Sequence, residues 1–379
     1  MSTIYLDYNA TTPVRPEVLE ECLPYFKADF GNPSSAHAYG RNPAQAVALA
    51  RVRLGALLGC TPDEIVFTGC GSESDNLAIK GIADTQRHRG NHIITTSIEH
   101  PAVILTCRYL EAKEFEVTYL PVDEFGRVSP EDVAGAITDR TILITVMHAN
   151  NETGSIQPIS EIGRIARGKG VCFHTDAAQS VGKVPVNVDE LGVDLLTVAG
   201  HKFYAPKGVG ALYVRRGTTL EPLIHGGGQE RGFRAGTENV ALIAGMGKAA
   251  ELADEELDSN RRRLTALRDT LQSALEAAPG HTKLNGHPTE RLPSTLNMSF
   301  EGIDSSELLA SLPEIAASTG SACHADRKEP SAVLTAMGVP RDLALGAVRL
   351  SIGRYTTEDD ITRASEMIAA KATKMRGNT

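Results

Sequence analysis

Two residues of this chain, a lysine and an aspartate, have the types and the placement to hold one particular cofactor. Lys202 follows the apolar stretch Leu195–Val198, and Asp176 follows the strand-like stretch Val171–His174. Pyridoxal phosphate requires an amine that forms an imine with its aldehyde and a carboxylate that keeps its ring nitrogen protonated. A lysine and an acid at the carboxyl ends of two strands therefore predict a pyridoxal phosphate site.

A glycine turn before a helix-like segment is the candidate phosphate site. The strand-like residues Glu64–Thr68 run into Gly69–Ser72, and a helical pattern follows. Such a turn presents free backbone N–H groups and the positive end of the helix dipole, with Gly71 and Ser72 at its centre. His201, beside the lysine, is a second candidate for the phosphate. The turn is neither a Walker motif nor a Rossmann fingerprint, so a tight turn with a capping serine is the alternative.

Three further polar residues follow strand-like segments and are candidates for contacts with the ring. Gln179 lies three residues after Asp176 and shares its direction if a helical turn begins there. Asn151 follows the strand-like stretch Thr141–Val146 and offers an amide to a phenolic oxygen. His100 stands at a helix start, where it stacks on the ring, moves protons or only caps the helix.

Cys323 is the candidate nucleophile among the six cysteines of the chain. It lies in the small, polar, glycine-bearing segment 318–330, which predicts an exposed loop. Solvent access and the neighbouring His324 favour the reactive thiolate, although an incidental surface cysteine is the alternative. The cysteines form no CxxC pair and no zinc-ligand spacing, so we expect no metal site.

Strand-like and helix-like segments alternate, which predicts an α/β fold with a mainly parallel sheet covered by helices on both faces. The strands are expected at 64–68, 92–96, 115–120, 141–146, 171–174, 195–198 and 210–214, and the helices at 44–58, 73–89, 101–113, 130–137 and 159–169. Ligands of such sheets gather at the carboxyl ends of the strands, where this pattern puts Asp176 and Lys202. A long charged helix over about 240–278 then leads into a smaller α+β unit with strands at 294–300 and 348–352.

Charge and hydropathy exclude several classes of partner. The formal net charge of −9 disfavours binding to nucleic acid or to an anionic membrane. No apolar run is long enough to span a bilayer, and the N-terminus lacks the pattern of a signal peptide. We therefore expect a cytoplasmic protein of 379 residues with no membrane segment.

The chain resembles the NifS/IscS group of cysteine desulfurases in the class V aminotransferase superfamily. The resemblance runs from Tyr5–Pro13 to Arg349–Thr357, which is nearly the full chain. The motifs between these ends that carry it are Gly31–Ser35, Ser72–Asn76, Glu99–Val103, Asn150–Gly154, His174–Gln179, Gly200–Lys202 and Gly320–Cys323. The resemblance implies the fold type I architecture, with a seven-stranded sheet in a large domain. It places that domain at 15–255 and a small domain, which carries the cysteine loop, at 1–14 and 256–379.

The resemblance also implies a role for each residue around the ring. Lys202 would bind the cofactor as an imine and later take the Cα proton of the substrate. Asp176 would pair with the ring nitrogen, and Gln179 and Asn151 with the phenolic oxygen. His100 would stack on the ring.

Further roles concern the phosphate, the substrate and the sulfur. The resemblance implies that Gly71, Ser72 and His201 hold the phosphate, and that Thr237 reaches the phosphate of the other subunit in a homodimer. Arg349, with Asn151, would bind the substrate carboxylate. Cys323 would take the sulfur of L-cysteine as a persulfide, release L-alanine and pass the sulfur to a protein acceptor.

Two departures from the family pattern leave the substrate open. Family members usually carry a phosphate-binding serine where Ala199 stands, and many have Cys-Thr-Ser where this chain has Cys323-His324-Ala. Both departures resemble selenocysteine lyases, whereas Pro101 after the histidine resembles NifS-like enzymes and favours cysteine.

The type of protein and the sulfur acceptor also stay open. A carbon–sulfur lyase or transaminase would leave Cys323 idle, and a non-enzymatic interaction protein would keep the fold without the chemistry. Lys202, Asp176 and Cys323, all present, argue against the non-enzymatic protein. Iron–sulfur assembly, tRNA thiolation and a specialised biosynthetic route are all compatible destinations for the sulfur.

Overall fold

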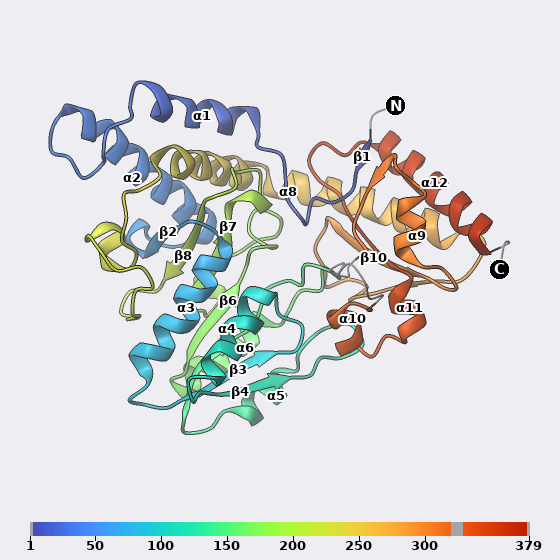
Figure 1. The fold of residues 1–379 in the computed structure, drawn as a ribbon, viewed down its shortest axis with the longest axis horizontal. Helices are drawn as coiled ribbons and strands as arrows, with labels where there is room; N and C mark the ends of the chain where they lie inside the picture. The colour runs from blue at the N-terminus through green and yellow to red at the C-terminus, as the bar shows by residue number, and fades with distance from the viewer. Residues whose placement is uncertain (1–2, 320–328, 377–379) are drawn as a thin grey trace.

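The structure is a computed structural model that describes residues 3–319 and 329–376 (Figure 1). The strands form a seven-stranded sheet, a three-stranded sheet and a two-stranded sheet within these residues. Cys323 and its neighbours lie outside the described residues. The predicted α/β architecture is confirmed.

The large sheet carries the predicted strands in a mixed, mostly parallel arrangement. Its strand order is β2 (Ile65–Thr68), β8 (Gly210–Val214), β7 (Leu195–Ala199), β6 (Cys172–Asp176), β5 (Thr141–Thr145), β3 (His92–Thr96) and β4 (Glu116–Leu120). Only β8 runs antiparallel to its neighbours, β2 and β7. The carboxyl ends of β2, β3, β5, β6 and β7 therefore meet at one edge of the sheet.

Helices cover both faces of this sheet, and the strands are apolar on both sides for that reason. Neighbouring residues of β3 show the division: Ile93 packs into one core and Ile94 into the other. The helices of this part are α1 (Pro16–Lys27), α2 (Ala38–Leu58), α3 (Gly71–Gln86), α4 (Pro101–Glu111), α5 (Pro130–Ala136), α6 (Ile159–Lys169) and α7 (Val188–Leu191), with short 3₁₀ turns η1 (Pro62–Glu64), η2 (Gly200–Lys202) and η3 (Gln229–Gly232). Buried residues of α3 and α4 share the core of Ile93, and those of α2 and α6 share the core of Ile94.

Apart from the two cores of the large sheet, another hydrophobic core lies in the half of the molecule that contains the C-terminal segment. The long helix α8 (Val240–Glu276) runs from one half to the other, as Figure 1 shows. Beyond it lie β9 (Thr282–Leu284), β10 (Thr295–Phe300), α9 (Ser305–Ala310), β11 (Ile315–Ala316), α10 (Ala332–Ala336), α11 (Arg341–Leu345), β12 (Ala347–Ser351) and α12 (Glu358–Arg376). The N-terminal strand β1 (Ile4–Tyr5) also belongs to this half, because it pairs in parallel with β11.

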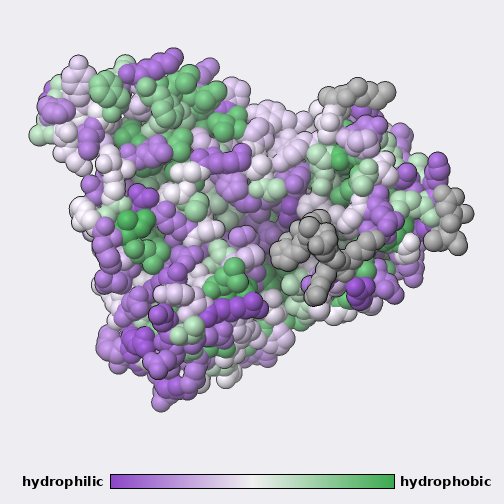
Figure 2. Space-filling model, viewed as in Figure 1, coloured by the Kyte–Doolittle hydropathy of each residue, from purple (hydrophilic) through white to green (hydrophobic). Residues whose placement is uncertain are grey.

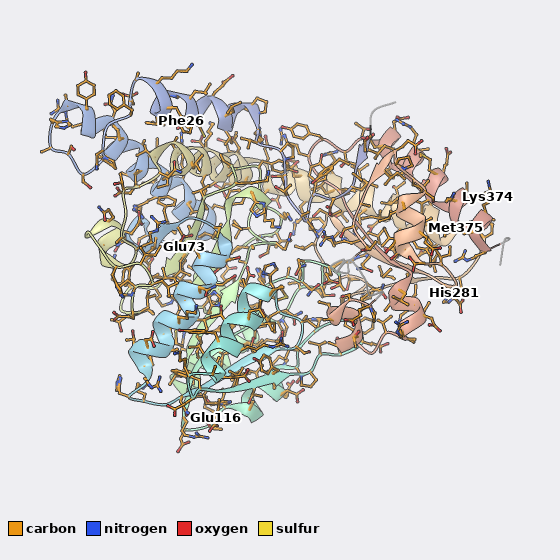
Figure 3. All side chains as sticks on the ribbon, viewed as in Figure 1. Phe26, Glu73, Glu116, His281, Lys374 and Met375 are labelled. Atoms are coloured by element: carbon orange, nitrogen blue, oxygen red, sulfur yellow. The ribbon has the colours of Figure 1, made fainter. Side chains whose placement is uncertain are left out.

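The surface includes an apolar region over the N-terminal helix. The side chains of Leu19, Leu23 and Phe26 on α1 are 52%, 39% and 62% exposed. Figure 2 shows hydrophobic residues gathered over this helix, and Figure 3 shows Phe26 at the outer surface. In the described ranges, no helix combines the length and the apolar character that a bilayer crossing requires.

Candidate active site

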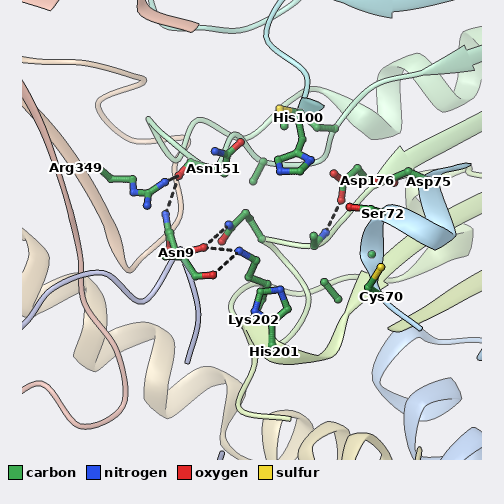
Figure 4. Close-up of a pocket in the computed structure, with 17 residues that line it drawn as sticks. Asn9, Cys70, Ser72, Asp75, His100, Asn151, Asp176, His201, Lys202 and Arg349 are labelled. Atoms are coloured by element: carbon green, nitrogen blue, oxygen red, sulfur yellow. Dashed lines mark hydrogen bonds between the residues drawn. The ribbon is translucent and has the colours of Figure 1, made fainter. Parts of the chain in front are cut away.

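A cavity of about 350 Å³ opens at the edge where the parallel strands end (Figure 4). Most of the residues predicted from the sequence line it: Gly71, Ser72, His100, Asn151, Asp176, Gln179, His201, Lys202 and Arg349. The remaining lining residues are Asn9, Ala10, Cys70, Asp75, Met147, Ala149, Ala178 and Ala199. The fold therefore gathers side chains from several strand ends, the N-terminal segment and β12 around one space.

One predicted residue lines another cavity, and one lies outside the described residues. Thr237 is exposed and lines a different, smaller cavity of about 160 Å³, together with Gly69 and Arg234. Cys323 falls outside the described residues. The roles of both residues stay predictions.

Lys202 stands in the 3₁₀ turn η2, directly after β7. Its Nζ donates to the backbone carbonyls of Asn9 at 2.6 Å and Ala10 at 2.9 Å. Burial, assisted by the charge of Arg349, lowers the pKa of its amine to about 8. A lysine with such a pKa supplies far more free amine near neutral pH than an exposed lysine does.

Asp176 ends β6, and its carboxylate accepts a hydrogen bond from the backbone N–H of Ala178 at 2.9 Å. Burial raises its pKa, whereas this hydrogen bond and the nearby His100 and Lys202 act in the opposite direction. A cationic group placed beside this buried carboxylate would favour its ionised form.

Asp75 is a second buried carboxyl group on the same cavity, contributed by α3. Burial raises its pKa well above the usual value, and the charge of Asp176 acts in the same direction. Its Oδ1 has no hydrogen-bond partner among the described residues, and Nε2 of His174 lies 3.8 Å from it. Burial lowers the pKa of His174 to about 3, so the imidazole is neutral and does not balance a charge on Asp75. Of the two carboxyl groups, Asp176 has the contacts that favour a negative charge, with the backbone of Ala178 and with His100 and Lys202.

The two histidines of the cavity are both neutral near pH 7. His100 caps α4, and its Nδ1 accepts from the backbone N–H of Ala102 at 3.1 Å, so the neutral ring carries its proton on Nε2. Burial lowers its pKa. Nδ1 of His201 lies 3.1 Å from Oγ1 of Thr11, and burial lowers the pKa of His201 to about 4.

The start of α3 lies at one end of the cavity, where the sequence predicts the phosphate site. Cys70 caps the helix, and Gly71 and Ser72 occupy its first turn, where backbone N–H groups have no intrahelical partner. A Cβ added to Gly71 would come within 3.1 Å of the Cβ of Ala199, so glycine keeps this end open. The acid of the first turn, Glu73, is paired with Arg234 at 2.9 Å.

Arg349 enters from β12 at the opposite end of the cavity. Its Nη2 donates to the carboxylate of Asp7 at 2.8 Å, and its Nη1 donates to the carbonyl of Asn151 at 3.2 Å. Its Nε is buried and has no partner among the described residues. The guanidinium is therefore fixed in place with donor capacity to spare, which suits a carboxylate ligand.

Several residues of this site have no role predicted from the sequence. Asn9, which is 1% exposed, accepts through its backbone carbonyl from Lys202 and Gln179 and donates through Nδ2 to the carbonyl of Asn151. Asp7, Asp75, Cys70 and Lys183 are further such residues. The polar residues within the motif Tyr5–Pro13 are the signal from which Asp7 and Asn9 could have been found.

The donor set of the cavity fits pyridoxal phosphate. The helix start at Gly71 and Ser72 suits a phosphate, the amine of Lys202 suits an aldehyde, and the buried carboxylate of Asp176 suits a protonated ring nitrogen. The unfilled donor of Arg349 suits the carboxylate of an amino acid. The cofactor and an amino acid substrate thus find complementary groups in one cavity.

Comparisons with known proteins agree with this geometry. The family model described as aminotransferase class-V matches residues 4–364. A cysteine desulfurase IscS from Methanosarcina thermophila is 52% identical over 375 residues, which cover 98% of this chain and 93% of the relative. A solved structure titled NifS-like protein superposes with a TM-score of 0.92 at 39% identity, covering 98% of this chain and 100% of the other. Another, titled SspA in complex with cysteine, gives 0.84 at 41% identity and covers 94% of this chain and 100% of that one.

Proposed function

We propose that this chain, which belongs to the aminotransferase class-V family, is a pyridoxal phosphate-dependent cysteine desulfurase. It converts L-cysteine to L-alanine and leaves the sulfur as a persulfide on Cys323. The family predicted from the sequence motifs is confirmed by the match over residues 4–364. The observation that carries the proposal is the single cavity that joins Lys202, Asp176 and Arg349, in a chain about half identical to proteins named cysteine desulfurases.

The cofactor would be held by three groups of residues. Gly71, Ser72 and His201 would bind its phosphate, and Asp176 would pair with its ring nitrogen. Gln179 and Asn151 would bind its phenolic oxygen, and His100 would stack on the ring. When bound, pyridoxal phosphate supplies an aldehyde that takes up amines and a protonated ring that withdraws electrons from the substrate Cα.

The reaction then depends on proton and sulfur transfers by the chain's own residues. Arg349 holds the substrate carboxylate, and Lys202 takes the Cα proton, for which its lowered pKa is suited. The Cys323 thiolate attacks the substrate sulfur, so that a sulfur–sulfur bond forms and the bond between Cβ and sulfur breaks. The electron pair of the broken bond stays with the carbon fragment, which takes up protons and leaves as L-alanine.

L-Cysteine is the favoured substrate for two reasons. Relatives at about 50% identity are named cysteine desulfurases, and one structural relative at 41% identity is described in complex with cysteine. The guanidinium of Arg349 lines the cavity and suits an amino acid carboxylate.

The proposal includes a homodimer and a two-domain chain. Thr237 is exposed and does not line the cavity of its own subunit, which supports a contact with the phosphate of a second subunit. We assign residues 15–255 to the large domain and residues 1–14 and 256–379 to the small domain that carries Cys323. A protein sulfur acceptor and a cytoplasmic location complete the proposal.

The alternative on the same scaffold is a selenocysteine lyase, which Ala199 and His324 favour. The test is to measure alanine formation by the purified holoprotein from L-cysteine and from L-selenocysteine, with the wild type and Cys323→Ala. Preference for L-cysteine and loss of sulfur transfer in the variant support a desulfurase. Preference for L-selenocysteine supports the lyase, and full turnover of L-cysteine by Cys323→Ala supports a carbon–sulfur lyase with an idle Cys323.

A further inference from the structure

Lys183 contacts two residues that line the cavity, and none of the roles proposed above involves it. The Nζ of Lys183 donates to Oε1 of Gln179 at 2.9 Å and lies 3.5 Å from Oδ1 of Asn9. Lys183 itself does not line the main cavity, whereas Gln179 and Asn9 do. We propose that Lys183 is a positioning residue, which fixes the side-chain amide of Gln179 so that an N–H group faces the bound cofactor. This inference rests on the proposed function.

The orientation of the Gln179 amide follows from the chemistry of its two partners. Its Nε2 donates to the backbone carbonyl of Asn9 at 3.0 Å, and a carbonyl oxygen can only accept. Its Oε1 accepts from the Nζ of Lys183, and the protonated form of that amine can only donate. A rotated amide would face a donor with its nitrogen and an acceptor with its oxygen, so both contacts exclude the rotated form.

One N–H of Gln179 is left for the cavity. The amide nitrogen carries two hydrogens, and the carbonyl of Asn9 takes one of them. Because the side chain is buried and lines the cavity, the second hydrogen is available to an acceptor oxygen bound there. Without Lys183, only the carbonyl of Asn9 would oppose the rotated amide, whose oxygen would repel such an acceptor.

Burying the amine of Lys183 lowers the stability of the fold, which argues that its contacts are not incidental. Burial, assisted by the charges of Lys202 and Arg349, lowers the pKa of its amine to about 7. Among the described residues, no acidic side chain lies within ion-pair distance of Lys183, and amide oxygens receive its hydrogens. A buried amine without a carboxylate partner destabilises the fold unless hydrogen bonds compensate for the lost hydration. In this protein those hydrogen bonds are made with Gln179 and Asn9.

Asn9 couples this pair to the reactive lysine. Its backbone carbonyl receives both Nε2 of Gln179 and Nζ of Lys202, at 3.0 Å and 2.6 Å. Its own side chain is held through Nδ2 by the hydroxyl of Thr295 at 2.9 Å. The acceptor that fixes one end of Gln179 is thus itself fixed, and Lys183 fixes the other end.

A double-mutant cycle tests the inference in the full-length protein. Pyridoxal phosphate is titrated into the apoprotein of the wild type, Lys183→Met, Gln179→Ala and the double variant, and the dissociation constant and the absorbance maximum of the bound cofactor are recorded. We expect Lys183→Met to weaken binding about tenfold and to shift the absorbance maximum in the wild-type background. In the Gln179→Ala background, where no amide needs orientation, the same change should alter binding less than about twofold.

Equal effects of Lys183→Met in both backgrounds would overturn the inference, because Lys183 would then act independently of Gln179. Lys169→Met, at an exposed position on α6, controls for the loss of a lysine. If Lys183→Met does not fold, Gln179→Glu replaces it, since a carboxylate keeps the bond from Lys183 but offers the cavity no donor. Wild-type affinity and absorbance in Gln179→Glu would also overturn the inference. A wild type that binds no pyridoxal phosphate contradicts the proposed function itself.

Discussion

Arg349, which lines the cavity, forms an ion pair with Asp7, with 2.8 Å between Nη2 and the carboxylate oxygen. The two residues stand 342 positions apart in the chain, and a β-bridge between Asp7 and Ser351 brings the N-terminal segment to β12. The group proposed to hold the substrate carboxylate is therefore already held by an acid. Its second anchor is the carbonyl of Asn151, at 3.2 Å.

The ion pair predicts an effect of Asp7→Asn on substrate affinity. Without the carboxylate, the guanidinium loses the partner that fixes its direction, and we expect the KM for L-cysteine to rise about tenfold. The affinity for pyridoxal phosphate should stay within about twofold of wild type. Steady-state kinetics and cofactor titration measure both quantities.

Asp84→Asn is the matched control, because Asp84 is an exposed acid on α3 outside the cavity. A KM that falls in Asp7→Asn would contradict the prediction. It would mean that Asp7 only competes with the substrate for Arg349.

Asp176→Asn should lower kcat for alanine formation by about 10²-fold or more, because the amide cannot balance a protonated ring nitrogen. The cofactor should still attach at Lys202, which the visible absorbance of the purified variant reports. Asp75→Asn is the informative comparison: if Asp75 is neutral in the fold, its amide variant should lose much less activity. Equal losses in both variants would contradict the assignment of the charge to Asp176.

The lowered pKa of Lys202 predicts the pH dependence of cofactor attachment. Only the neutral amine reacts with the aldehyde, and burial lowers the pKa of this amine to about 8. The attachment rate of the apoprotein should rise with pH through about 8 and then level off, whereas a free lysine side chain, with a pKa of about 10.4, keeps accelerating. Stopped-flow absorbance on either side of this midpoint measures it, and a rate that still rises steeply about two pH units above it contradicts the prediction.

Because position 199 has no hydroxyl, we predict that Ala199→Ser increases the affinity for pyridoxal phosphate. Ala199 lines the cavity next to Gly71, at the end proposed to hold the phosphate. A charge-assisted hydrogen bond to the phosphate should slow cofactor release and tighten binding about five- to tenfold. Dialysis against a competing amine measures the release rate, with Ala199→Gly as the control that adds no hydroxyl. Unchanged release by the serine variant would show that another group already fills this role.

The apolar runs of the sequence predicted the strands of the large sheet, because strands that are buried on both faces are apolar at successive positions. β3 and β8 have the predicted bounds, and the other strands shift by a residue or two. The helix expected at 44–58 begins instead at Ala38. Gly40 and Pro43 have low helix propensity and obscure its first turns, although both are buried in the structure.

Local sequence located the strand-end residues of the site but not the residues that support them. Asp176 and Lys202 follow apolar runs, so their common edge could be inferred from a parallel sheet. Asn9 and Lys183 act through contacts with Gln179 that span 170 residues in one case and four in the other. The contact with Asn9 depends on how the N-terminal segment packs against the cavity. The contact with Lys183 is local, but a four-residue spacing alone does not show that two side chains meet.

The most direct test is mass spectrometry of the intact holoprotein and its peptides after brief exposure to L-cysteine without an acceptor. We predict one additional sulfur atom on the peptide that contains Cys323, sensitive to reduction, together with an equal amount of L-alanine. Cys323→Ala should show no added sulfur while Lys202 still binds the cofactor. Alanine formation with no sulfur on Cys323, or with the sulfur on another cysteine, would contradict the proposed function.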